Sequence, residues 1–93
     1  MHASRSRATA VKHPSAYYED WMRAEETAFF LVAQAKAQTD QQLIQQAEGH
    51  LFVCKTKVAK YAYGTQPEER ADLEAATKNS TELARLVLKA KRI

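Results

Sequence analysis

The chain has 93 residues, of which 45% are hydrophobic, and it contains two glycines, two prolines and one cysteine. This length predicts a single domain, and one cysteine excludes an internal disulfide framework. No apolar run approaches the ~20 residues that a membrane-spanning helix needs, and the beginning of the chain has no apolar signal-peptide segment. We therefore expect a soluble, cytoplasmic protein.

The formal net charge of +3 is concentrated at the beginning of the chain. Residues 1–14 contain Arg5, Arg7 and Lys12 and no acidic residue, so the rest of the chain is close to neutral. We expect residues 1–14 to form a basic N-terminal extension and residues 15–93 to form the folded domain. The extension is either a short solvated segment or an arm that contacts an acidic partner. Its Ser/Ala/Arg-rich composition without acidic residues also suits a transit peptide, which is the less favoured alternative.

The first predicted helix covers residues 16–38. Ser15 follows a proline and is suited to be its N-cap, and Glu19 and Asp20 complement the positive end of the helix dipole.

Two capping boxes predict the other helices. They are Thr39-Asp40-Gln41-Gln42, at the start of a helix over 40–62, and Thr65-Gln66-Pro67-Glu68, at the start of a helix over 66–91. Gly64 is a suitable stop between them. Similar helix lengths and short connections predict an all-α fold, an antiparallel up-down-up three-helix bundle.

Each predicted helix has one apolar stripe when residues are placed at intervals of about 100°. The side chains expected to face the core are Tyr17, Tyr18, Trp21, Ala28, Phe29, Leu31, Val32 and Ala35 in the first helix, Leu43, Ile44, Ala47, Leu51, Cys54, Val58, Tyr61 and Ala62 in the second, and Leu73, Ala76, Leu83, Ala84, Val87 and Ala90 in the third. The antiparallel order also brings lysines near the end of the second helix beside acidic residues near the start of the third. These are Lys55, Lys57 and Lys60, and Glu68, Glu69, Asp72 and Glu74.

Four apolar residues, Phe30, Phe52, Ala59 and Tyr63, fall outside these stripes. They are either simply exposed, or covered by the basic extension or a crossed helix, or part of a protein interface. We adopt the hypothesis of a protein interface. It is formed either with another protein or, as we prefer, between two copies of this chain through the first two helices.

A second group interrupts the stripes with polar side chains. Glu25 lies in the stripe of the first helix, and Thr77 and Ser80 lie in that of the third at the same level. With His50 they are predicted to form a structural polar layer that fixes the helix register, although Glu25 at the rim is an alternative. His50 and Cys54 share a helix face, but zinc spacings and a second cysteine are lacking. We predict no metal, cofactor, small-molecule substrate or enzymatic activity.

Gly49 lies inside the second predicted helix, where glycine costs about 1 kcal/mol relative to alanine. We expect it to allow close packing of Phe29 or Phe30; a kink is the alternative.

Basic residues also follow one face of the third helix. They are Lys78, Arg85, Lys89 and Arg92, and Arg5 and Arg7 of the extension are able to add to them. Such a stripe is able to follow phosphates, although glutamates interleave with it. The preferred function is a small non-enzymatic helical protein–protein interaction module of adaptor, chaperone-like or inhibitor type. The alternative is a small basic regulator that binds DNA or RNA.

Overall fold

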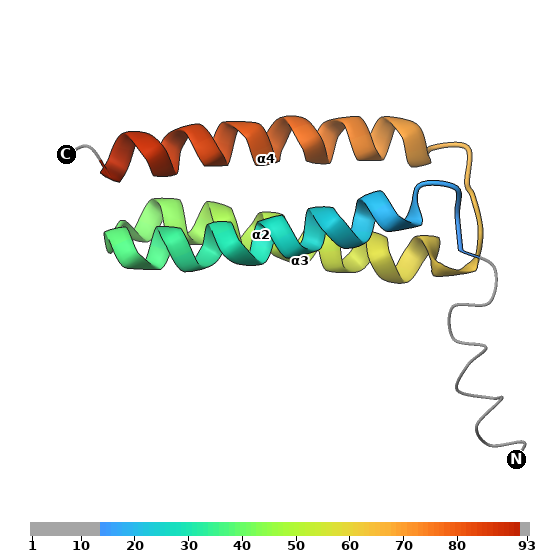
Figure 1. Cartoon of the computed structure of the whole chain (residues 1–93), viewed down its shortest axis with the longest axis horizontal. Helices are drawn as coiled ribbons and strands as arrows, with labels where there is room; N and C mark the ends of the chain where they lie inside the picture. The colour runs from blue at the N-terminus through green and yellow to red at the C-terminus, as the bar shows by residue number, and fades with distance from the viewer. Residues whose placement is uncertain (1–13, 92–93) are drawn as a thin grey trace, which may run out of the picture.

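The computed structural model describes residues 14–91, which form three long helices and one short 3-10 helix (Figure 1). Helix α2 spans Tyr18–Gln38, α3 spans Gln41–Lys60, η2 spans Tyr61–Tyr63 and α4 spans Glu69–Lys91. The prediction of an all-α chain with three helices is therefore confirmed. The basic extension, residues 1–13 of it, lies outside the described part of the chain.

The helices lie side by side along the longest dimension of the molecule (Figure 1). Trp21 near the start of α2 stacks on Tyr61 after the end of α3, and Lys36 near the end of α2 approaches Glu48 in α3. Helices α2 and α3 therefore run in opposite directions. Helix α4 contacts both of them.

Helix α2 begins two residues later than predicted. Its N-cap is Tyr17, which makes no side-chain capping hydrogen bond. Ser15 is buried, and its Oγ donates a hydrogen bond to Oε2 of Glu69. The prediction of Ser15 as the N-cap is wrong because its hydroxyl joins the start of the chain to α4 instead.

Both predicted capping boxes are also wrong in detail. Asp40 caps α3, since its Oδ1 accepts a hydrogen bond from the backbone N–H of Leu43 at 3.1 Å. Thr39 ends α2 in the left-handed conformation, with φ of 56°. Thr65 Oγ1 accepts a hydrogen bond from the backbone N–H of Ala16 at 3.2 Å. The hydroxyl predicted to start α4 thus fastens the segment before α2.

The core consists of two clusters. One contains Leu31, Val32, Ala35, Leu43, Ala47, Leu83 and Val87. The other contains Trp21, Tyr61 and Ala76. Most of the predicted stripes are buried or half-buried, but Phe29 and Ala84 are exposed. Each lies at the edge of its stripe, where the helix surface turns from its neighbours toward solvent.

Gly49 does not serve close packing. No atom outside the local helix backbone lies within 4 Å of the position that a Cβ would take at this residue. The residue is exposed in α3, and only glycine's conformational freedom distinguishes it from alanine there.

We therefore expect Gly49→Ala to raise the free energy of unfolding by about 1 kcal/mol, because alanine favours the helix. Urea unfolding followed by circular dichroism measures this change. Gly64→Ala is the matched control: Gly64 has a φ of 138°, which strains any other residue, so this variant should lose stability. A less stable Gly49→Ala protein would contradict the open surroundings of Gly49.

Candidate interaction surface

All three phenylalanines of the chain are exposed, whereas its single tryptophan is fully buried. The exposed fractions are 67% for Phe29, 61% for Phe30 and 70% for Phe52. Phenylalanine is normally among the most buried residue types, and three exposed rings on two neighbouring helices are unusual for a monomer. The apolar surface of α2 and α3 is therefore the first candidate for a functional site.

The exposed side chains of α2 and α3 follow a regular pattern. We define the α2–α3 face as Met22, Glu26, Phe29, Ala33 and Lys36 of α2 together with Gln45, Glu48, Phe52, Lys55 and Ala59 of α3. Every member is exposed. Their spacing alternates between three and four residues, which keeps them on one side of each helix, as in the seam of a coiled coil. Each helix thus carries a second stripe, with one phenylalanine at its middle position.

The contacts between α2 and α3 place these two phenylalanines at neighbouring levels along the helices. Trp21 stacks on Tyr61, so residue 29, eight positions after Trp21, lies at about the level of residue 53, eight positions before Tyr61. Lys36 Nζ lies 3.8 Å from Glu48 Oε2. By the same count, residue 29, seven positions before Lys36, lies at about the level of residue 55, seven positions after Glu48. Phe29 is therefore within about one turn of the level of Phe52.

Among the predicted interface residues, Phe52 and Ala59 are members of the α2–α3 face. Phe30 lies about 100° around α2 from Phe29, so it borders the face. Tyr63, 68% exposed, lies in η2 beyond the end of α3. Phe29 and Met22 are not among the predicted interface residues. Their seven-residue spacing indicates a shared stripe, but Phe29 also falls at the edge of the predicted core stripe, which assigns it to the core.

The predicted polar layer has different neighbours around His50. This side chain is buried, with Nε2 3.7 Å from Cys54 Sγ and Nδ1 3.3 Å from Asn79 Nδ2. Glu25 and Ser80 are half-buried and Thr77 is exposed. The structure does not bring these three into hydrogen-bond contact with His50. Asn79 is not among the predicted residues, because a polar residue flanked by two other polar residues in α4 gives no indication of which way its side chain points.

The pair formed by His50 and Cys54 is poorly suited to nucleophilic chemistry. Burial lowers the pKa of His50, so the imidazole is neutral at pH 7. Burial, and then the charge of Glu25, raise the pKa of the Cys54 thiol. A thiolate is therefore disfavoured, although the thiolate is the reactive form. Within residues 14–91, no three histidine, cysteine or acidic side chains are grouped so that they could hold a metal ion.

A denser polar cluster joins the start of α2, η2 and the start of α4. Glu69 is only 1% exposed, and its Oε2 accepts hydrogen bonds from Ser15 Oγ and, at 3.1 Å, from Trp21 Nε1. The Trp21 and Tyr61 rings stack with their centroids 5.6 Å apart. The backbone N–H of Ser15 donates to the carbonyl oxygen of Tyr61 at 3.0 Å. These contacts hold the segment before α2 against both other helices.

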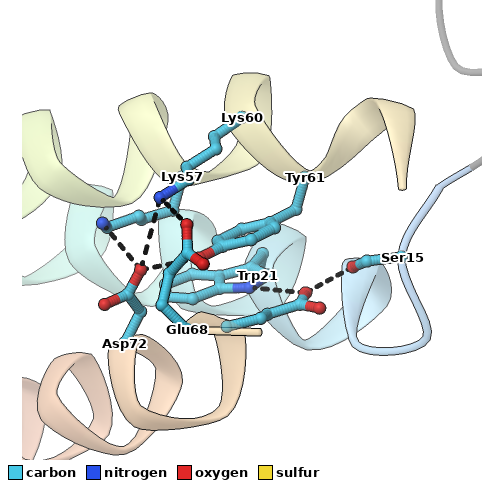
Figure 2. A network of polar contacts seen from close by, with 8 residues as sticks. Ser15, Trp21, Lys57, Lys60, Tyr61, Glu68 and Asp72 are labelled. Carbon is cyan, nitrogen blue, oxygen red and sulfur yellow. Dashed lines mark hydrogen bonds and ion pairs between the residues drawn. The ribbon is translucent and has the colours of Figure 1, made fainter. Parts of the chain in front are cut away.

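The outer part of this cluster is charged (Figure 2). The Tyr61 hydroxyl donates to Asp72 Oδ2 at 2.6 Å, and Lys57 Nζ lies 3.0 Å from the same oxygen. Lys60 Nζ is 2.7 Å from Glu68 Oε2. The predicted pairing between the end of α3 and the start of α4 is thus confirmed for these residues. Each charged group in this outer part therefore has a partner of opposite charge, and these ion pairs join the end of α3 to the start of α4.

The same contacts shift the pKa values of two side chains, Asp72 and Tyr61. Hydrogen bonds from Tyr61 and then Lys57 lower the pKa of Asp72. Burial, followed by the hydrogen bond to Asp72, raises the pKa of Tyr61 to about 12. The phenol therefore stays protonated, and able to donate, throughout the neutral range.

The predicted nucleic-acid residues are only partly within the described chain. Lys78, Arg85 and Lys89 are exposed on α4, and Arg85 forms an ion pair with Glu82 at 3.0 Å. Arg5, Arg7 and Arg92 lie outside the described residues. Across residues 14–91, no helix combines the length and the apolarity required to cross a membrane.

The lowered pKa of Asp72 predicts a pH-dependent contribution to stability. This contribution is fully present above about pH 4 and is lost as the pH falls through the folded-state pKa, because protonation removes the charged acceptor. We expect Asp72→Asn to be less stable than wild type at pH 7 by about 1–3 kcal/mol, with the difference shrinking below pH 4.

Urea unfolding at a series of pH values measures this difference. Asp20→Asn is the matched control, since Asp20 is in an exposed pair with Arg23 and should change stability little. A difference between wild type and Asp72→Asn that does not vary with pH would contradict the assigned role.

Comparisons with protein-family models, with curated proteins and with solved structures found no match for this chain.

Proposed function

We propose that the chain is a small non-enzymatic helical interaction module that self-associates through the α2–α3 face. In this proposal residues 15–93 act as an antiparallel up-down-up bundle, preceded by a basic extension. The observation that supports it most strongly is the exposure of Phe29 and Phe52 at neighbouring levels, each at the middle of a stripe with coiled-coil spacing.

The size of the face suits a dimer of moderate affinity. Two helices of about 20 residues, each about 30 Å long and packed 8–10 Å apart, present roughly 600 Å² per copy. Two copies would bury about 1,200 Å², the lower limit of a standard interface. Burial of each phenylalanine contributes about 1.5–3 kcal/mol. The sum of these contributions over the interface has to exceed an association cost of at least about 4 kcal/mol.

A second copy fits this face better than the N-terminal extension does. The extension offers Met1 and Val11 as its only large apolar side chains, together with three positive charges. The face itself carries acidic and basic residues in near balance, Glu26 and Glu48 against Lys36 and Lys55. An equal mixture of charges on one surface permits contact with an identical surface without net repulsion.

The basic residues of α4 support the alternative function less well. Lys78, Arg85 and Lys89 share a face, but Glu82 interleaves with them and already pairs with Arg85. Phosphate-driven binding would weaken steeply with salt, whereas an apolar self-interface is largely insensitive to it.

We expect the wild-type protein to be a dimer at micromolar concentration, at both low and high salt, and Phe29→Ser/Phe52→Ser to be a monomer. The reason is that the variant removes the two largest apolar groups of the face. Light scattering coupled to size-exclusion chromatography measures the mass. Leu88→Ser is the matched control, because Leu88 is 54% exposed on α4 and outside the face, so this variant should remain dimeric. A monomeric wild-type protein at every concentration would show the proposal to be wrong.

A further inference from the structure

We infer that two copies meet about a two-fold axis parallel to the helices, with α2 of each copy packed on α3 of its partner. This inference rests on the proposed self-association and specifies its geometry. A contact between two identical faces requires a two-fold axis through the middle of the face, here at the level of Phe29 and Phe52. An axis that brings the two faces together has to lie in the plane of the face, so two directions are available: along the helices, or across them.

An axis along the helices keeps every residue at its own level and exchanges α2 with α3. Phe29 then lies against the partner's Phe52. Lys36 meets the partner's Glu48, a pair whose levels match because the two side chains are 3.8 Å apart within one chain. Glu26 comes within about one turn of the partner's Lys55. All four charged side chains of the face therefore gain an opposite charge.

Two of these four charged side chains form no ion pair elsewhere in the described chain, and the other two pair only with each other. Glu26 and Lys55 are both exposed, and neither forms an ion pair within residues 14–91. The side chains of Lys36 and Glu48 are 61% and 52% exposed, so their mutual contact leaves both accessible.

The axis across the helices places α2 on the partner's α2 and α3 on the partner's α3. Lys55 then meets the partner's Glu48, which is favourable. Lys36, however, meets the partner's Met22, and Glu26 meets the partner's Ala33. Two of the four charged side chains, Lys36 and Glu26, therefore gain no opposite charge from the partner, so the axis along the helices satisfies the face best.

Crosslinking between introduced cysteines distinguishes the two axes, because each gives residue 22 a different neighbour. The axis along the helices places residue 22 near the partner's Ala59, and the axis across them places it near the partner's Lys36. Met22→Cys protein is mixed in turn with tagged Ala59→Cys or Lys36→Cys protein and treated with a short bis-maleimide.

Native Cys54 stays in place, because it is buried and its thiol pKa is raised. Wild-type protein treated in the same way reports any reaction at that thiol. Light scattering on each mixture reports whether the two variants still associate.

We expect most of the tagged crosslinked product in the mixture of Met22→Cys with Ala59→Cys. Product mainly in the mixture of Met22→Cys with Lys36→Cys, or none in any mixture that remains dimeric, would overturn the axis while leaving the self-association intact. Monomers in every mixture and in the wild-type protein would overturn both the axis and the proposed function.

Discussion

A hairpin of two long helices has two broad sides, and a single third helix covers only one of them. In this chain α2 and α3 carry apolar side chains on both sides. Helix α4 covers the side that contains the core clusters. The other side keeps Phe29 and Phe52 in contact with water. This shortage of cover is the constraint from which the proposed self-association follows, since a second hairpin supplies the missing helices.

The end of the molecule formed by Trp21, Tyr61 and Glu69 gives the helices a fixed register. A stacked aromatic pair and a buried carboxylate with two donors have demanding geometry, so sliding one helix past another would break several contacts together. Fixed register matters for the α2–α3 face. The two stripes present their charges and rings at matching levels only while α2 and α3 stay in place.

The periodicity of apolar residues was sufficient to predict three helices and most of the buried stripes. It was not sufficient for the ends of the helices. Ser15 and Thr65 looked like N-caps, but their hydroxyls make hydrogen bonds to residues distant in the sequence. Local patterns do not contain that choice, because it depends on which segments meet in the fold.

The candidate face was also only partly predictable. Phe52 was identified from its position outside the core stripe, whereas Phe29 lies at the edge of its stripe, where an error of one residue's rotation decides between core and surface. Likewise His50 was predicted to be part of a polar group. Whether Asn79 faces His50, as it does in the structure, depends on the rotation of α4 about its own axis. Side-chain spacing along one helix does not fix that rotation.

The most direct test of the central claim uses the fact that all three phenylalanines are exposed. Protein labelled with fluorophenylalanine gives ¹⁹F signals only from Phe29, Phe30 and Phe52. We predict that the signals of Phe29 and Phe52 shift with protein concentration and lose their sensitivity to solvent as the copies associate, while that of Phe30 changes less. Signals that stay independent of concentration and open to solvent would contradict the account.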